Sequence, residues 1–359
     1  MSFPTYQFMN TSTKFRLFHQ VRASTSAITR VVILWLSLAG HAAAAEPRTP
    51  VEVHGQLRVA GNRIVNQYGE PVQLRGMSLF WSQWMPKYYN ADALRWLRDD
   101  WNSNLVRVAM AVGSGGYLTN PDEEMRKVRT VIDTAIELGI YVIIDWHDHH
   151  ADRNVEAAKK FFGEIAREYG HRPHLIYEPW NEPLNTHDWG KVIRPYHEAI
   201  IPVIRAHDPD NLIILGTQTW SQDVDKAAAD PVAGDNLAYT LHFYAATHKQ
   251  RLRDKARKAL EAGVALMVTE WGTSEATGGG KLDYEETAAW LEFMDRHQLS
   301  WCNWSVADKR ETSAALRPGA AGVGGWTDEV ISPSGLLVRQ ELRAKNPPAS
   351  LKLPVKSSP

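Results

Sequence analysis

The sequence of 359 residues has little cysteine, no excess of charge of one sign and no long apolar run. A single cysteine, Cys302, excludes an internal disulfide framework and a zinc site built from cysteine clusters. The 40 Lys and Arg residues are balanced by 41 Asp and Glu, and a formal charge of −1 argues against nucleic-acid binding through bulk positive charge. With 44% hydrophobic and 23% charged residues, the composition is that of a globular protein.

Several short catalytic motifs are also missing. No G-x-S-x-G occurs, so a serine nucleophile on a strand-to-helix elbow is not indicated. No H-E-x-x-H zinc motif occurs either. The glycine-rich segment 113–116 follows the second predicted strand and precedes a helix that begins at Pro121, so we interpret it as a loop and not as a dinucleotide-binding fingerprint.

The two ends of the chain differ from its middle. Residues 1–45 contain basic but no acidic residues, and an apolar run at 31–39 is followed by four alanines that end at Ala45. This order predicts a secretory signal peptide cleaved near Ala45, because the run is about half of the roughly 20 residues that a membrane span needs. We therefore expect a secreted or periplasmic bacterial protein. Residues 346–359 contain Pro and Ser without an apolar period and predict a disordered tail, which leaves residues 46–345 as a single domain.

The middle of the chain alternates short β-rich runs with helical patterns. The predicted strands are 73–78, 105–110, 141–145, 175–180, 212–216, 238–243, 266–269 and 299–303. The predicted helices are 90–100, 121–138, 154–169, 190–207, 250–262 and 283–297, with a shorter fifth connection. This alternation predicts an α/β fold, a (β/α)8 TIM barrel, with a doubly wound open sheet as the alternative. Turns at 61–62 and 68–69 predict a short β-hairpin before the barrel.

Polar and aromatic residues stand at the carboxyl ends of nearly all predicted strands. In a barrel these ends meet at one mouth, where barrel enzymes carry their chemistry. The segments concerned are 145–150, 180–183, 219–222, 242–244, 269–272 and 301–305. A barrel with a purely structural role has no need of them, so the pattern predicts a functional site at the mouth.

Two glutamates in these segments, Glu182 and Glu270, stand three strands apart. Two carboxylates across a barrel mouth can cleave a glycosidic bond, since one can protonate the leaving oxygen while the other attacks the anomeric carbon. These roles require different pKa values. Asn181 can hold a sugar 2-hydroxyl. Tyr244 can donate a hydrogen bond to Glu270, and Arg107 can lower the pKa of that carboxyl from beneath.

The histidine-rich segment 145–152 offers a second chemistry, hydrolysis by a bound metal. Its candidate ligands come from one loop and not from several strands, and strand alternation separates Asp145 and His147 from their neighbours. We therefore predict no metal and no other cofactor. His149, His150 and Asp152 are interpreted as a solvated loop.

Tryptophan is abundant, with 14 Trp against 12 Tyr and 9 Phe. Indole rings can stack on the flat C–H faces of sugars, and eight of these residues fall at predicted strand ends or loops: Trp81, Trp84, Trp146, Trp180, Trp220, Trp271, Trp304 and Trp326. Among them, Trp146, Trp180 and Trp271 are expected to pack behind the site.

In their order along the chain, these motifs resemble glycoside hydrolase family 5, in particular its bacterial secreted endo-β-1,4-glucanase branch. The resemblance covers about residues 54–345. Its landmarks are Gln73-Leu74-Arg75-Gly76, Asp145-Trp146-His147, Asn181-Glu182-Pro183, His242-Phe243-Tyr244, Thr269-Glu270-Trp271-Gly272 and Asn303-Trp304-Ser305.

The resemblance implies a retaining endo-β-1,4-glucanase (cellulase) that acts on β-1,4-glucan by double displacement. Glu182 would match the acid/base and Glu270 the nucleophile. The supporting residues would be Arg107, His147, Asn181, His242 and Tyr244. The substrate-binding residues would be Trp84, Trp220, Trp304, Lys309 and Glu311.

Other readings stay open at this point. A mannanase, a xyloglucanase or a mixed-linkage glucanase would use the same scaffold. A barrel that binds carbohydrate without cleaving it is opposed by the presence of both carboxylates. We also expect a monomer, no nucleic-acid partner and no membrane span after removal of the signal peptide.

Overall fold

The computed structural model describes residues 48–348. The predicted signal peptide and cleavage site near Ala45 lie outside the described residues, as do residues 349–359 of the predicted tail. Within residues 48–348, no helix combines the length and apolar character that crossing a bilayer would require.

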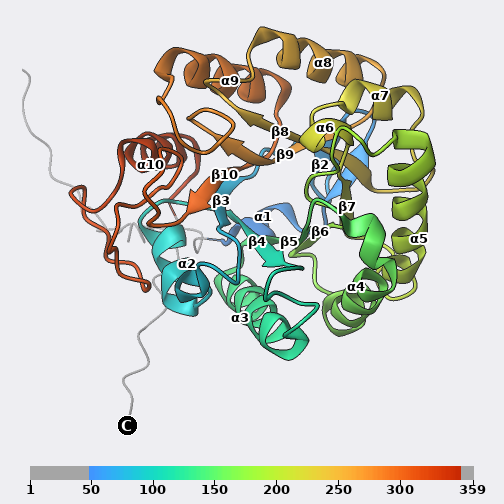
Figure 1. The fold of residues 1–359 in the computed structure, drawn as a ribbon, viewed down its shortest axis with the longest axis horizontal. Coiled ribbons are helices and arrows are strands. Elements are labelled where there is room, and N and C mark those ends of the chain that lie inside the picture. The colour runs from blue at the N-terminus through green and yellow to red at the C-terminus, as the bar shows by residue number, and fades with distance from the viewer. Residues whose placement is uncertain (1–47, 349–359) are drawn as a thin grey trace, which may run out of the picture. The chain divides into compact units, whose positions relative to one another are not determined.

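Eight parallel strands close into a barrel at the centre of the fold (Figure 1). They are β3 (Arg75–Leu79), β4 (Leu105–Ala111), β5 (Tyr141–His147), β6 (Leu175–Glu178), β7 (Leu212–Leu215), β8 (Leu237–Tyr244), β9 (Leu266–Gly272) and β10 (Trp301–Val306). Strands that follow one another in the chain are neighbours in the barrel, and β10 pairs with β3 to close it. The predicted (β/α)8 barrel is confirmed, and the closing pair excludes the open sheet.

Helices surround the strands (Figure 1), and those that lie between two barrel strands in the chain return it to the start of the next strand. The longer ones are α2 (Ala91–Asp99), α3 (Pro121–Leu138), α4 (Val155–Tyr169), α5 (Arg194–Arg205), α8 (Gln250–Glu261), α9 (Tyr284–His297) and α10 (Pro333–Lys345). The fifth connection is short as predicted, with α6 (Gln218–Ser221) and α7 (Val224–Ala229). Short 3-10 turns cover Pro86–Tyr88 and Ala151–Asn154, and one π-helical turn, Trp189–Ile193, precedes α5.

Helix α3 illustrates how the sequence forms these elements. Pro121 stands in its first turn, which also holds three acidic residues that favour the positive end of the helix dipole. Its buried face includes Val128, Val131 and Ala135 at helical spacing. The helix ends at Gly139, which has a positive φ of 65°. A side chain at Gly139 would also meet Thr49 at 2.3 Å, so glycine is required there for two reasons.

The segment before the barrel covers the amino-terminal ends of the strands. As predicted, β1 (Arg58–Ala60) and β2 (Arg63–Val65) form an antiparallel hairpin. A short helix that was not predicted, α1 (Pro50–His54), precedes the hairpin and begins with a capping box between Thr49 and Glu52. Leu57, Ile64 and Val72 pack with the first residues of several barrel strands. The same cluster buries the lone cysteine, Cys302 of β10, and burial raises the pKa of its thiol far above the usual value.

The folded domain extends past the predicted boundary at residue 345. Asn346, which the sequence placed in the disordered tail, is buried. Its side-chain amide donates to the backbone carbonyls of Arg75 at 3.1 Å and of Asn102 at 2.8 Å. Asn346 therefore caps the amino-terminal end of the barrel, and the two prolines that follow it misled the sequence prediction.

Candidate active site

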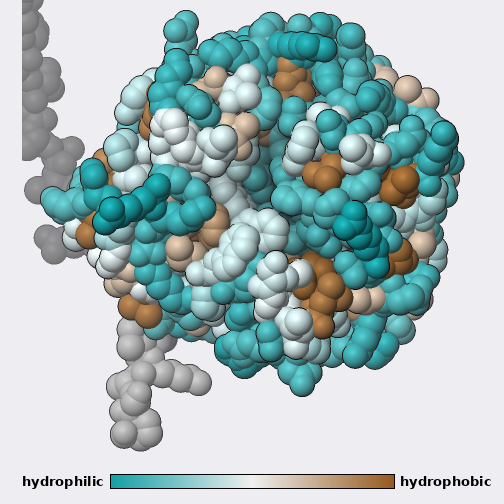
Figure 2. Space-filling view, in the orientation of Figure 1, coloured by the Kyte–Doolittle hydropathy of each residue, from teal (hydrophilic) through white to brown (hydrophobic). Residues whose placement is uncertain are grey.

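A cleft crosses the mouth of the barrel, and both candidate glutamates lie in it. One cavity of about 380 Å³ is lined by Glu182, Trp220, His242 and Glu270 among others. A second cavity of about 280 Å³ is lined by both glutamates together with Trp84 and further residues. Figure 2 shows a hollow near the middle of the ring of helices. Because the two cavities share Glu182 and Glu270, the cleft extends to both sides of the carboxylates.

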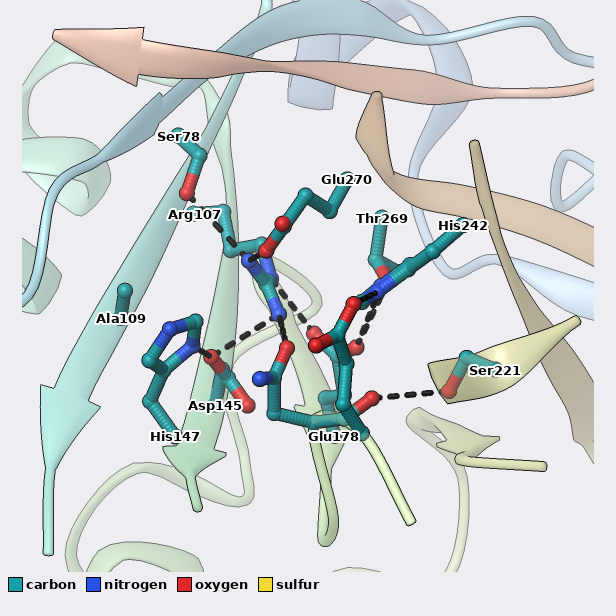
Figure 3. Close-up of polar contacts among 12 residues, drawn as sticks. Ser78, Arg107, Ala109, Asp145, His147, Glu178, Ser221, His242, Thr269 and Glu270 are labelled. Carbon is teal, nitrogen blue, oxygen red and sulfur yellow. Dashed lines mark hydrogen bonds and ion pairs between the residues drawn. The ribbon is translucent and has the colours of Figure 1, made fainter. Parts of the chain in front are cut away.

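Glu270, near the carboxyl end of β9, is held through both of its oxygens. Tyr244 donates its hydroxyl to Oε1 at 2.8 Å. Figure 3 shows the second contact, in which the Arg107 guanidinium donates to Oε2 at 3.0 Å. Burial raises the pKa of Glu270, and the nearby charge of Glu182 raises it further, whereas His242, Arg107 and Tyr244 oppose the shift. Both contacts fix the carboxylate and favour its ionised form, which is what a nucleophile requires.

Arg107 of β4 is the centre of the charged network beneath the cleft. The fully buried guanidinium lies 3.0 Å from Asp145 and 2.7 Å from Glu178, besides its contact with Glu270. It also donates to the side-chain oxygen of Asn181 at 2.7 Å. Burial disfavours the charged form of Arg107, but the three carboxylates raise its pKa well above the usual value. Arg107 is thus a permanent cation that orients the side chains above it.

Glu182 has one imidazole at each of its oxygens. His242 Nδ1 lies 2.9 Å from Oε1, and His149 Nε2 lies 3.2 Å from Oε2. Burial raises the pKa of Glu182, but hydrogen bonds from both imidazoles outweigh this and lower it to about 2. Burial likewise lowers the pKa of His242, but the nearby carboxylates of Glu178 and Glu182 raise it to about 9. At a pH between about 2 and about 9, the Glu182–His242 pair therefore holds one proton.

The hydrogen bonds behind His242 show where that proton lies. The Thr269 hydroxyl donates to Glu178 at 2.6 Å, so its oxygen accepts the Nε2–H of His242 at 2.8 Å. In the neutral ring Nε2 carries the proton, so Nδ1, which faces Glu182, is unprotonated. One proton is shared between Nδ1 and the carboxyl oxygen, and this pair can give it up and take it back.

The separation of the two glutamates fits direct attack. A carboxylate oxygen of Glu182 and one of Glu270 lie within 4.8 Å of each other. Retaining glycosidases separate the two carboxyl groups by about 5–5.5 Å, whereas inverting enzymes need about 6.5–9.5 Å to admit a water molecule. The short spacing here is on the retaining side of this division and leaves no room for the water molecule of an inverting enzyme.

The remaining predicted residues also line this cleft. His147 stacks on the indole of Trp304, with ring centroids 5.1 Å apart and planes 7° apart, so it supports that ring. Lys309 and Glu311 form an ion pair of 2.6 Å on the same side of the cleft. Trp84 is 56% exposed on this side, and Trp220 is 38% exposed on the opposite side. Both indoles are open to a flat ligand.

The other tryptophans divide between cleft and core. Trp146, Trp180 and Trp271 are buried, as expected. Trp326, another of the eight tryptophans at predicted strand ends or loops, lies in a loop as predicted and belongs to the core. It is buried against Tyr88 and Trp101, in a loop whose course cannot be read from the sequence.

Three residues of the site were missed or misjudged from the sequence. Glu178 and Thr269 form the network under His242, and a lone glutamate in an otherwise apolar strand is a signal for Glu178, since buried charges need partners. His149 was interpreted as part of a solvated loop. Its side chain is 38% exposed, but its ring reaches Glu182.

The second histidine cluster does not offer three free ligand atoms to a metal. Ligand atoms of His150, Asp152 and His187 lie within 4.8 Å of one another. Nδ1 of His187, however, accepts the backbone N–H of Leu184 at 2.9 Å. The proton of the neutral ring is therefore on Nε2, which faces Asp152 at 3.6 Å and has no lone pair for a metal.

A (β/α)8 barrel with two carboxylates at this spacing, one sharing a proton with a histidine and the other held by Arg107 and Tyr244, defines a glycoside hydrolase. The family model described as Cellulase (glycosyl hydrolase family 5) matches residues 65–310, and the chain belongs to this family.

Relatives and solved structures agree with this assignment. The chain is 46% identical over 295 residues to an endoglucanase of Clostridium saccharobutylicum, covering 81% of this chain and 66% of the relative. It is 50% identical over 267 residues to endoglucanase Z of Dickeya dadantii, covering 73% and 62%. The chain thus spans about two thirds of the length of these relatives.

Among solved structures, a protein from Cytophaga hutchinsonii gives a TM-score of 0.83 at 56% identity, covering 83% of this chain and 98% of that one. The catalytic domain of Thermobifida fusca endoglucanase Cel5A gives 0.79 at 36% identity, covering 82% and 99%.

Proposed function

We propose that this chain is a retaining endo-β-1,4-glucanase that hydrolyses internal bonds of cellulose and related β-glucans. The observation that carries the proposal is the pair of glutamates within 4.8 Å, of which Glu182 shares a proton with His242 while Glu270 is held by Arg107 and Tyr244. The names of the relatives, which are endoglucanases, support the substrate class.

In the first step, Glu270 attacks the anomeric carbon of the sugar on its side of the scissile bond. The proton shared by Glu182 and His242 passes to the glycosidic oxygen, so the leaving chain departs as a neutral alcohol. The products are the shortened glucan and a glycosyl ester on Glu270. Asn181, whose carbonyl oxygen is held by Arg107, lines the cleft and is placed to bind the 2-hydroxyl.

In the second step, a water molecule replaces the departed chain. Glu182 takes a proton from this water, which attacks the same carbon and releases Glu270 as a carboxylate. The proton returns to the pair that supplied it, so the site is restored. Two displacements at one carbon leave its configuration unchanged.

Aromatic and polar residues on either side of the carboxylates would bind the glucan chain. We assign Trp84, Trp304, Lys309 and Glu311 to one side and Trp220 to the other. A mannanase, a xyloglucanase or a mixed-linkage glucanase would need the same two carboxylates. A panel of these polymers, assayed for reducing ends, separates the four activities.

We also propose that the protein acts outside the cytoplasm as a monomer after cleavage near Ala45. Mass spectrometry of the protein recovered from culture medium and periplasm tests the cleavage site and the location. Light scattering tests the oligomeric state.

The decisive test of the function removes the nucleophile. Glu270→Gln should lower the hydrolysis of carboxymethylcellulose by at least ~10³-fold, because the amide cannot form the glycosyl ester. Glu285→Gln, at an exposed site on α9, is the matched control and should keep full activity. In the wild type, NMR of the products should show the β-anomer first. Full activity in Glu270→Gln, or the α-anomer first, would refute the proposal.

A further inference from the structure

His149 makes a contact with Glu182 that the proposed mechanism has not used. It lies in the loop after β5, and its ring packs edge-on against Trp81 with centroids 5.9 Å apart. From this position its Nε2 lies 3.2 Å from Oε2 of Glu182, and the ring lines the cleft beside that carboxyl.

The charged groups that face His149 come from several elements. Glu182 follows β6, Glu270 lies on β9, and Asp148 is its neighbour in the chain. Burial lowers the pKa of His149, but the hydrogen bond to Glu182 and these three negative charges raise it overall. His147 on β5 adds a repulsive contribution when charged. His149 therefore presents an N–H to Glu182 in an environment that favours donation.

We propose that His149 is a positioning residue for the acid/base, which fixes the plane of the Glu182 carboxyl during proton transfer. This inference rests on the proposed function of Glu182. The terminal torsion of a glutamate is broad, so a single hydrogen bond from His242 to Oε1 leaves rotation possible. The second hydrogen bond, from His149 to Oε2, prevents this rotation. Trp81 packs against the imidazole ring of His149 and holds it in place.

The proposed role has a chemical signature that a merely structural role lacks. Cleavage of cellotetraose needs a proton on a poor leaving group, whereas an aryl cellobioside with an activated phenol needs little protonation. A residue that acts through the acid therefore affects kcat/KM for the first substrate much more than for the second. A residue that only supports the fold affects both equally.

The experiment compares kcat/KM on both substrates for His149→Ala and His149→Gln. We expect the ratio of cellotetraose to aryl cellobioside activity to fall by about 10-fold or more in His149→Ala. His149→Gln should restore part of the ratio, because its amide can still donate. His150→Ala is the matched control from the same loop, where His150 packs against His187, and it should keep the wild-type ratio.

A pH profile gives the second readout. A donor to the ionised carboxyl, and a positive charge beside it, both lower the pKa of the acid. The basic limb of kcat/KM should accordingly move to higher pH in His149→Ala. Equal losses on the two substrates in His149→Ala would overturn the inference.

The variant Glu182→Gln distinguishes an error in the role of His149 from an error in the proposed function. If Glu182→Gln lowers the ratio but His149→Ala does not, only the role of His149 is wrong. If Glu182→Gln leaves the ratio unchanged, Glu182 is not the acid and the proposed function itself fails.

Discussion

The ionisable side chains in the cleft lie so close together that the charge of each depends on its neighbours. Arg107 is surrounded by Asp145, Glu178 and Glu270, and Glu182 is surrounded by imidazoles. Sequence spacing places these residues at strand ends, but their protonation depends on burial and on contacts between distant strands. The position of both glutamates in one cleft was therefore predictable, whereas the proton shared by Glu182 and His242 was not.

This arrangement predicts a bell-shaped pH dependence of kcat/KM. As the proposed nucleophile, Glu270 must be ionised. Burial together with the charge of Glu182 raises its pKa, so activity should fall on the acid side above the usual glutamate value of about 4.3. On the basic side, activity should fall as the Glu182–His242 pair loses its proton, near the His242 pKa of about 9. An acid limb at or below the ordinary glutamate value would contradict this assignment.

Tyr244→Phe tests the acid limb directly. The Tyr244 hydroxyl donates to the ionised form of Glu270, and loss of that bond should raise the pKa of Glu270 further. The acid limb of kcat/KM should move to higher pH while the basic limb stays in place. A shift of the basic limb alone would place Tyr244 with the acid and not with the nucleophile.

At the scale of elements, α3 supports the loop that carries Trp81 and Trp84. Glu124 accepts a hydrogen bond from the Ser82 hydroxyl, and Lys127 donates to Glu124 at 2.6 Å and to the carbonyl of Ser82 at 3.1 Å. Helical periodicity predicted α3 and its apolar face. It could not predict that this face also buries an ion pair, because a pattern of hydrophobicity assigns charges to solvent.

Breaking this buried pair should destabilise the protein. Glu124→Gln leaves the Lys127 ammonium buried without its partner, and we expect a loss of about 3–5 kcal/mol in the free energy of unfolding. Glu123→Gln, which breaks the exposed pair with Arg126 on the same helix, is the control and should leave the stability close to that of the wild type. Urea unfolding followed by tryptophan fluorescence measures both. Equal midpoints for the two variants would show that burial of the pair has no energetic effect.

For the whole molecule, closure of the barrel was the most predictable feature. Strands buried on both faces are continuously apolar, and eight of them alternating with helices leave few topologies. Features that depend on contacts between the ends of the chain were not predictable. Asn346 joins the segment after α10 to the first barrel strand, and nothing local in the sequence distinguishes it from the residues that follow.

Asn346→Ala tests the contribution of this contact to stability. The substitution leaves the backbone carbonyls of Arg75 and Asn102 without their side-chain donor, and a cost of about 1–3 kcal/mol is expected. Gln340→Ala, at an exposed site on α10, should change stability by at most ~0.5 kcal/mol. Thermal unfolding compares the two variants. A wild-type melting temperature for Asn346→Ala would place the boundary of the domain back at residue 345.

The buried thiol of Cys302 can report on transient opening of the barrel. The residue lies in β10, opposite Gly76 of β3, at the seam where the barrel closes. A thiol with so high a pKa, shielded on all sides, should not react with alkylating reagents in the native state. Its rate of modification in dilute denaturant would therefore measure how often β10 and β3 separate. A new surface cysteine could meanwhile take a fluorophore selectively, without replacement of the native one.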